Sequence, residues 1–220
     1  MDHFSFPKEH GAYVVLFAGW LFGIIYSPCN DIAGFVLALI FACSLFFLQE
    51  PIRILFRGKG KRNIRLHRFS IIFILTAILS GILLMIRSSR ILYLAFPLMI
   101  IAIVYFSLVR KRTPAIALSL IGFSGLALIT PLTIVASNCA IAVPDLATIW
   151  LFSSLFFWGS LVCVNIRLSG VRAIAPAAGY HLFACAVTIL FVRLHDLPNS
   201  AIAVIAVSCL RLIVISLYYK

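Results

Sequence analysis

Residues 69–86 read FSIIFILTAILSGILLMI, and residues 91–109 read ILYLAFPLMIIAIVYFSLV. Only the polar segment RSSR separates these two apolar stretches. A helix needs roughly 20 apolar residues to cross a hydrocarbon core of about 30 Å. Each stretch is therefore long enough for one membrane-spanning helix, and the polar segment predicts the turn between them.

The whole chain has the same apolar character. It has 220 residues, of which 64% are hydrophobic and 11% charged, and its mean hydropathy is +1.16. This surface cannot be buried in one small soluble core, and the continuous apolar runs lack the alternation of barrel strands. We therefore predict an all-α fold, a polytopic transmembrane helical bundle that forms a single transmembrane domain over residues 1–220. About eight spans are expected, at residues 11–27, 31–49, 69–86, 91–109, 114–136, 146–166, 174–192 and 200–219.

The distribution of Lys and Arg predicts the orientation of this bundle. With eight spans, fourteen of the 18 basic residues face one side, whereas only Arg87, Arg90 and Arg193 face the other and Arg211 lies within the last span. Short loops rich in positive charge stay in the cytoplasm, so both termini are predicted to be cytoplasmic. Topology and attraction to anionic headgroups explain the net charge of +12. The expected partner is a lipid bilayer, and no nucleic acid is expected.

The six cysteines divide into two groups under this topology. Four of them fall within predicted spans, where thiols are common as small apolar fillers: Cys43, Cys163, Cys185 and Cys209. Cys29 and Cys139 fall in outside loops, where an oxidising compartment permits a disulfide. Since the sequence gives no distance between these two, two free thiols are the expectation and a disulfide is the alternative. No spacing of Cys or His indicates a metal site, and no cofactor is predicted.

The segment Lys8-Glu9-His10 stands directly before the first span. One interpretation is an interfacial anchor, in which Lys8 reaches the lipid phosphates and Glu9 neutralises it. The other interpretation is an acid/base pair, because Glu9 and His10 point about 100° apart on a helix at the cytoplasmic mouth of the bundle.

A second polar segment, Glu50-Pro51-Ile52-Arg53, closes the second span. Pro51 is expected to end or kink the helix at Glu50, which would leave the Glu50 carboxylate at the membrane surface. Arg53 begins a run of seven basic residues that ends at Arg68. Most of that run is attributed to topology, whereas Glu50 and Arg53 lie close enough to the bilayer to be site candidates.

A third polar segment, Asn165-Ile166-Arg167 with Arg172, lies at the predicted cytoplasmic end of the sixth span. A guanidinium beside an amide suits a phosphate or carboxylate, through charge-assisted hydrogen bonds. The alternative is two arginines that merely flank a span. His181, within the seventh span, is a weaker candidate for proton relay, since an interhelical hydrogen bond is its commoner role.

These segments together resemble a known family. The motif Pro7-Lys8-Glu9-His10-Gly11-Ala12 before an aromatic residue, Arg53 after Pro51, and Arg167 and Arg172 after Phe-Phe-x-Gly are similar to the YwiC-like bacterial membrane proteins. Tyr13 is a departure, because Trp is expected there. The resemblance implies an integral protein of the bacterial cytoplasmic membrane, in a family of uncharacterised activity.

The layout is more distantly similar to that of UbiA-type prenyltransferases. Those enzymes hold Mg²⁺ with Asn/Asp-rich motifs, because hard oxygen ligands suit that ion. Here no Asp-rich motif surrounds Glu50 or Asn165, and the six acidic residues are scattered. Ordinary prenyl transfer is therefore not expected, and arginines in the corresponding places are instead implied to bind an anionic headgroup directly.

We accordingly predict a cytoplasm-facing polar site for an anionic lipid or a phosphorylated isoprenoid. Whether the protein is an enzyme stays open. The alternatives are a membrane-embedded transferase that acts on a lipid and a small-solute transporter. The predicted ligand-binding residues are Lys8, Arg53, Asn165, Arg167 and Arg172, and the candidates for acid/base catalysis are Glu9, His10 and Glu50.

Overall fold

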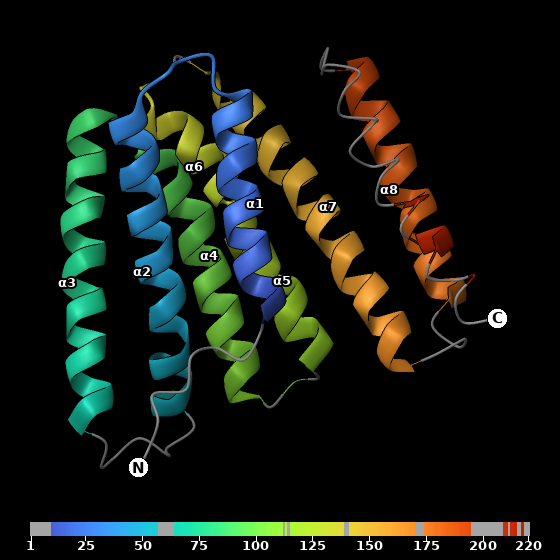
Figure 1. Ribbon diagram of the computed structural model, residues 1–220, viewed down its shortest axis with the longest axis horizontal. Coiled ribbons are helices and arrows are strands. Elements are labelled where there is room, and N and C mark those ends of the chain that lie inside the picture. The colour runs from blue at the N-terminus through green and yellow to red at the C-terminus, as the bar shows by residue number, and fades with distance from the viewer. Residues whose placement is uncertain are drawn as a thin grey trace. The chain divides into compact units, whose positions relative to one another are not determined.

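The computed structural model describes residues 10–56, 64–111, 113, 115–138, 141–169, 174–194, 209–210, 212–214 and 217 (Figure 1). Over these residues the chain is helical and has no strand, which confirms the predicted all-α bundle. The helices are α1 (His10–Tyr26), α2 (Ile32–Phe56), α3 (Ile64–Arg87), α4 (Ile91–Arg110), α5 (Ala115–Ala127), α6 (Ile129–Ala136), α7 (Val143–Ser169) and α8 (Ile174–Leu194).

The apolar helices coincide with the predicted spans. Among the described residues, five spans are long and apolar enough to cross a membrane: Ile32–Gln49, Phe69–Arg87, Ile91–Arg110, Ile116–Ala136 and Val143–Cys163. α1 and α8 add the shorter apolar segments Ala12–Tyr26 and Ile174–Leu190. The chain is thus a multi-pass membrane protein. The span expected at 200–219 lies mostly outside the described residues, and the orientation of the termini stays a prediction.

The chain divides into two compact units, Met1–Trp150 and Leu151–Lys220, here called unit 1 and unit 2. α7 begins in unit 1 and continues into unit 2. The single transmembrane domain predicted over residues 1–220 stays a prediction, and each unit is described by itself below.

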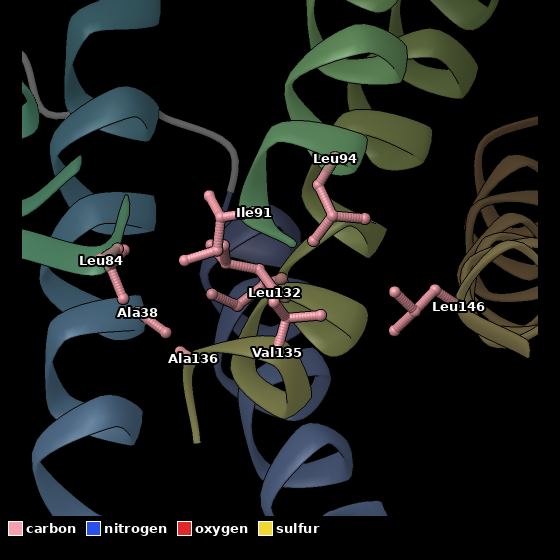
Figure 2. Close-up of a cluster of buried hydrophobic side chains, with 9 residues drawn as sticks. Ala38, Leu84, Ile91, Leu94, Leu132, Val135, Ala136 and Leu146 are labelled. Carbon is pink, nitrogen blue, oxygen red and sulfur yellow. The ribbon is translucent and has the colours of Figure 1, made fainter. Parts of the chain in front are cut away.

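α6 forms the centre of unit 1. All eight of its residues are buried, and it packs against α1, α2, α4 and α5. Figure 2 shows the apolar cluster around it, to which α2, α3, α4, α6 and the first turn of α7 contribute. The long outer helices instead expose large apolar side chains, as at Ile86 with 76% exposure. Such exposure is what a lipid solvent permits, since lipid chains are as apolar as the residues that face them.

Glycine allows α1 and α2 to approach α6 closely. A Cβ added to Gly23 in α1 would lie 2.5 Å from Thr133 Cβ in α6, and a Cβ on Gly34 in α2 would lie 2.2 Å from the Ala136 carbonyl oxygen. Small residues at such positions let helix backbones pack tightly in membranes. Ser27 directly follows α1 and Ser137 directly follows α6, and their Oγ atoms are hydrogen-bonded at 2.7 Å.

Two prolines shape the helices in different ways. α2 continues through Pro51 to Phe56, so of the two expected outcomes the end at Glu50 is excluded and the kink stays a prediction; neighbouring groups in membrane bundles can re-satisfy the backbone groups that a proline frees. The span expected at 114–136 is confirmed as the apolar segment Ile116–Ala136, which consists of two consecutive helices that meet at Leu128. The break has a local cause, because Pro131 cannot donate a hydrogen bond to the carbonyl of Ala127 and its ring crowds that carbonyl.

The connection between α1 and α2 carries a charged cap. The carboxylate of Asp31 accepts a hydrogen bond from the Gly34 N–H at 3.1 Å, which caps α2, and it forms an ion pair with Arg87 at the end of α3. Burial raises the pKa of the Asp31 carboxyl, but the Gly34 hydrogen bond and the Arg87 guanidinium outweigh it, so this pKa lies below its usual value. The positive charge of Arg87, one of the few basic residues on the predicted outside, is thereby paired with a carboxylate.

The cysteines also require a correction. Cys29 is disulfide-bonded, so the expectation of a free thiol there is wrong, and its alternative holds for this residue. Cys139 lies outside the described residues. Four cysteines are free thiols, as expected for residues within spans: Cys43, Cys163, Cys185 and Cys209.

Unit 2 is organised around one face of α8. Ala177, His181, Ala184 and Thr188 are all buried, and their spacing of three or four residues puts them on one side of the helix. Tyr180 Oη donates a hydrogen bond to the Leu155 carbonyl and so joins α8 to α7.

Candidate functional site

A cavity of about 440 Å³ lies within unit 1 and is called here the unit 1 cavity. Helices α1, α2, α4, α5 and α6 contribute to its walls, and almost all of the side chains that line it are apolar, among them Phe41, Leu94, Ile101 and Leu132. On the α4 wall Met99 is 54% exposed, so the cavity reaches the surface of unit 1 there. Its volume falls in the range of about 300–1,000 Å³ that is typical of small-molecule sites.

Two polar side chains, Gln49 and Tyr105, break this apolar lining. Gln49 Nε2 donates a hydrogen bond of 2.6 Å to Tyr105 Oη, and both residues line the cavity. Gln49 belongs to α2 and Tyr105 to α4, and the two residues are 56 positions apart in the sequence. Because Oη is the acceptor in this bond, the phenol keeps its own proton for a further partner. The Gln49–Tyr105 pair therefore offers polar groups to a ligand that fills the apolar space.

Gly122 of α5 borders this pair. A Cβ added at Gly122 would lie 3.8 Å from Tyr105 Cε2 and 3.9 Å from Gln49 Nε2, which is ordinary van der Waals contact. The glycine thus leaves space beside the only polar part of the cavity lining. A small side chain fits there without strain, whereas a large one would enter the cavity.

Tyr13 places a second hydroxyl near the cavity. Its ring packs edge-on against Phe46, with centroids 5.0 Å apart, and Phe46 is a cavity-lining residue. The Tyr13 oxygen is buried and has no hydrogen-bond partner in the described part of the chain. A buried polar atom without a partner is rare and requires an explanation, such as an absent ligand or water.

Three of the polar residues predicted from the sequence, His10, Glu50 and Arg53, stand near one end of unit 1 by their backbone positions. α1 begins, and α2 and α4 end, at the same end of unit 1, at the bottom of Figure 1. His10 is the first residue of α1, and Glu50 and Arg53 lie in the last two turns of α2. Gln49 and Ile52, which directly precede Glu50 and Arg53 in the sequence, line the cavity. The side chains of His10, Glu50 and Arg53 lie outside what the structure describes.

The remaining predicted residues are not brought into a site by the structure. Lys8, Glu9 and Arg172 lie outside the described residues, and Asn165 and Arg167 are described only as backbone in the last two turns of α7, in unit 2. The composite site built from these residues stays a prediction. Among the described residues, no group of three His, Cys, Asp or Glu side chains is placed to hold a metal ion.

Sequence reasoning missed the residues that surround the cavity. Gln49 was not singled out at the end of the predicted second span, and Tyr13 was noted only as a replacement for Trp. Tyr105 resembled any aromatic residue of a lipid-facing helix. The sequence did contain an indication for Gln49 and Tyr105. Their amide and phenol lie close to the same predicted end of two spans, and polar groups within spans need hydrogen-bond partners inside the bundle.

Comparison with known proteins identifies one family. The family described as YwiC-like protein matches residues 6–134 of the chain, which is more than half of its length. The matched range includes every residue that lines the unit 1 cavity. No curated protein and no solved structure matches the chain, so the similarity of layout to UbiA-type enzymes has no support there.

Proposed function

The chain belongs to the YwiC-like protein family, and on that premise we propose that this membrane protein binds a phosphate-bearing lipid, with a hydrocarbon chain of that lipid in the unit 1 cavity. The observation that carries the proposal is an apolar cavity whose only polar lining, in the part of the chain that the structure describes, is the Gln49–Tyr105 pair. A molecule that matches this lining is an amphiphile with a long apolar part and one polar end.

The composition of the lining favours a hydrocarbon chain over a polar solute. Among the described residues, none of the side chains that line the cavity is charged. A sugar, an ion or an amino acid would lose its hydrogen bonds to water there without replacement, at a cost of several kcal/mol. The cavity therefore does not favour the small-solute transporter as an alternative.

The surrounding sequence supports an anionic headgroup. Arg53 follows the cavity-lining Ile52 directly, and residues 53–68 contain seven basic residues. Arginine binds phosphate through charge-assisted and often bidentate hydrogen bonds. The buried hydroxyl of Tyr13 and the phenol of Tyr105 are further donors near the same end of the cavity. Phospholipids and isoprenyl phosphates share the combination of hydrocarbon chain and phosphate, and experiment must distinguish them.

The predicted orientation supports access from the cytoplasmic leaflet. The disulfide at Cys29, in the connection between α1 and α2, fits an oxidising compartment at that end of unit 1. The opposite end, where α2 ends, then faces the cytoplasm, in agreement with the basic residues of 53–68.

The test is native mass spectrometry of the full-length protein in nanodiscs that contain either phosphatidylglycerol or undecaprenyl phosphate. Wild type is compared with Gly122→Leu, which fills the space beside the Gln49–Tyr105 pair, and with Gly122→Ala, which fits that space. We expect wild type and Gly122→Ala to retain one lipid and Gly122→Leu to lose it.

The arms of the experiment separate the possible results. Retention of one lipid type alone identifies the headgroup chemistry, and its loss in Arg53→Ala locates the phosphate at the end of α2. Equal retention by wild type and Gly122→Leu would refute the cavity as the binding site.

A further inference from the structure

Unit 2 contains a group of thiols that the proposed lipid site does not use. Cys185 Sγ of α8 and Cys209 Sγ lie 3.4 Å apart, and Cys163 Sγ of α7 lies 4.0 Å from His181 Nε2 of α8. Cys185 and Cys209 are 24 residues apart in the sequence. Only the packing of the described residues near the C-terminus against α8 brings these two thiols together.

The separation of Cys185 and Cys209 is that of two thiols in direct contact. A disulfide has an S–S bond of about 2.04 Å, so the two sulfurs need to approach by only about 1.4 Å from their 3.4 Å separation to form one. Both residues are partly buried rather than fully enclosed, so a reactant can reach them.

His181 lies beside the third thiol of this group. Its Nδ1 lies 2.8 Å from the Ala177 carbonyl oxygen, and a carbonyl only accepts, so Nδ1 donates this hydrogen bond. The other ring nitrogen, Nε2, faces Cys163 Sγ. His181 stands one helical turn before Cys185 in α8.

We propose that Cys185 and Cys209 form a redox-active dithiol that a lipid-soluble two-electron acceptor of the quinone class oxidises to a disulfide. Both thiols lose their protons, the S–S bond forms, and the quinone takes up two electrons and two protons to become the hydroquinone. An apolar acceptor suits this place, because the adjacent side chains of Leu182 and Leu210 are apolar and exposed. The disulfide ties α8 covalently to the residues that follow it, and a thiol reductant reverses the reaction.

The test uses the full-length protein in nanodiscs, treated with duroquinone, a fully substituted quinone that does not add to thiols. The remaining thiols are alkylated in denaturant, and peptides are analysed by mass spectrometry without reduction. We expect the loss of two alkylatable thiols per chain, one duroquinol formed per chain, and a peptide that links Cys185 to Cys209. Dithiothreitol should restore both thiols.

Three variants make the result decisive. Cys185→Ser and Cys209→Ser should each abolish duroquinol formation, whereas Cys43→Ser, which removes a free thiol of unit 1, should behave like wild type. The disulfide of Cys29 is the same in all of them. Full alkylation of Cys185 and Cys209 after treatment of wild type would overturn the proposal, as would undiminished duroquinol formation in either serine variant. Neither result bears on the lipid site, which lies in unit 1.

Discussion

Replacement of Gly34 by alanine tests whether α2 and the end of α6 are in direct backbone contact. The new Cβ would lie 2.2 Å from the Ala136 carbonyl oxygen, 2.7 Å from the carbonyl carbon and 3.0 Å from Asp31 Oδ2. Real Cβ atoms essentially never come within 3.0 Å of such atoms, so the two backbones must separate by roughly 0.8 Å. No side-chain rotation relieves this clash, because the Ala136 atoms belong to the backbone of a fully buried helix.

The cost can be worked out from two opposing terms. Overpacking costs about 1–3 kcal/mol, and the upper end applies because a backbone has to move. Alanine in a helix returns about 1 kcal/mol relative to glycine. We therefore expect Gly34→Ala to lower the free energy of unfolding by about 2 kcal/mol, which corresponds to a decrease in Tm of roughly 4–8 °C for a chain of this size.

The matched control is Gly179→Ala in α8, where an added Cβ meets nothing within 4 Å. This variant keeps the propensity gain without a clash, so its Tm should equal or exceed that of wild type. Circular dichroism of the purified protein in one detergent measures both variants. A Tm for Gly34→Ala that equals the Gly179→Ala value would refute the close contact of α2 with α6.

Three further predictions follow from single contacts. The pKa of Asp31 lies below its usual 3.8 in the folded chain, so the stability from its contact with Arg87 is present above about pH 4 and is lost as the pH falls further. Since Arg87 is 36% exposed, Arg87→Gln should lower the free energy of unfolding by about 1 kcal/mol or less and should reduce the fall of Tm at acid pH. A fall of Tm at acid pH that is unchanged in Arg87→Gln would contradict the ion pair. Trp20→Phe removes the 2.8 Å hydrogen bond from the indole to the Phe35 carbonyl and should cost about 0.5–1.5 kcal/mol in thermal unfolding, whereas no loss would mean that water replaces the indole. Tyr13→Phe removes a buried hydroxyl without a partner in the described residues and should leave the Tm of lipid-free protein unchanged or higher, while weakening retention of the phosphate-bearing lipid; a lower Tm without lipid would show that the hydroxyl has a structural partner.

Local properties of the chain explain the parts of the fold that sequence reasoning predicted correctly. A span requires about 20 apolar residues in a row, and its backbone hydrogen bonds all lie within the helix. The helices over 32–49 and 91–109 therefore follow from the letters alone, whatever packs beside them. The continuation of α2 through Pro51 to Phe56 does not follow from such a local pattern, because proline commonly ends or kinks a helix and in membrane bundles neighbouring groups can re-satisfy the backbone groups that it frees.

The candidate site illustrates the same limit. Gln49 and Tyr105 each have an ordinary appearance in an apolar span, and their pairing arises only where α2 meets α4. The contact of Cys185 with Cys209 and the bonding of Cys29 also depend on where distant segments meet. Such distances are set by the packing of whole helices.

The amino-acid sequence by itself determined that this protein lies in a membrane, that it is helical, and roughly where each described span lies. These features follow from hydropathy and helix length, which are properties of consecutive residues. Tertiary structure alone decided that the short helix α6 lies buried at the centre of unit 1, that glycines admit α1 and α2 to its surface, and that five helices leave an apolar cavity beside one hydrogen-bonded polar pair. The physical reason is that apolar helices in lipid gain little from hydrophobic burial, so close packing and interhelical hydrogen bonds select their arrangement.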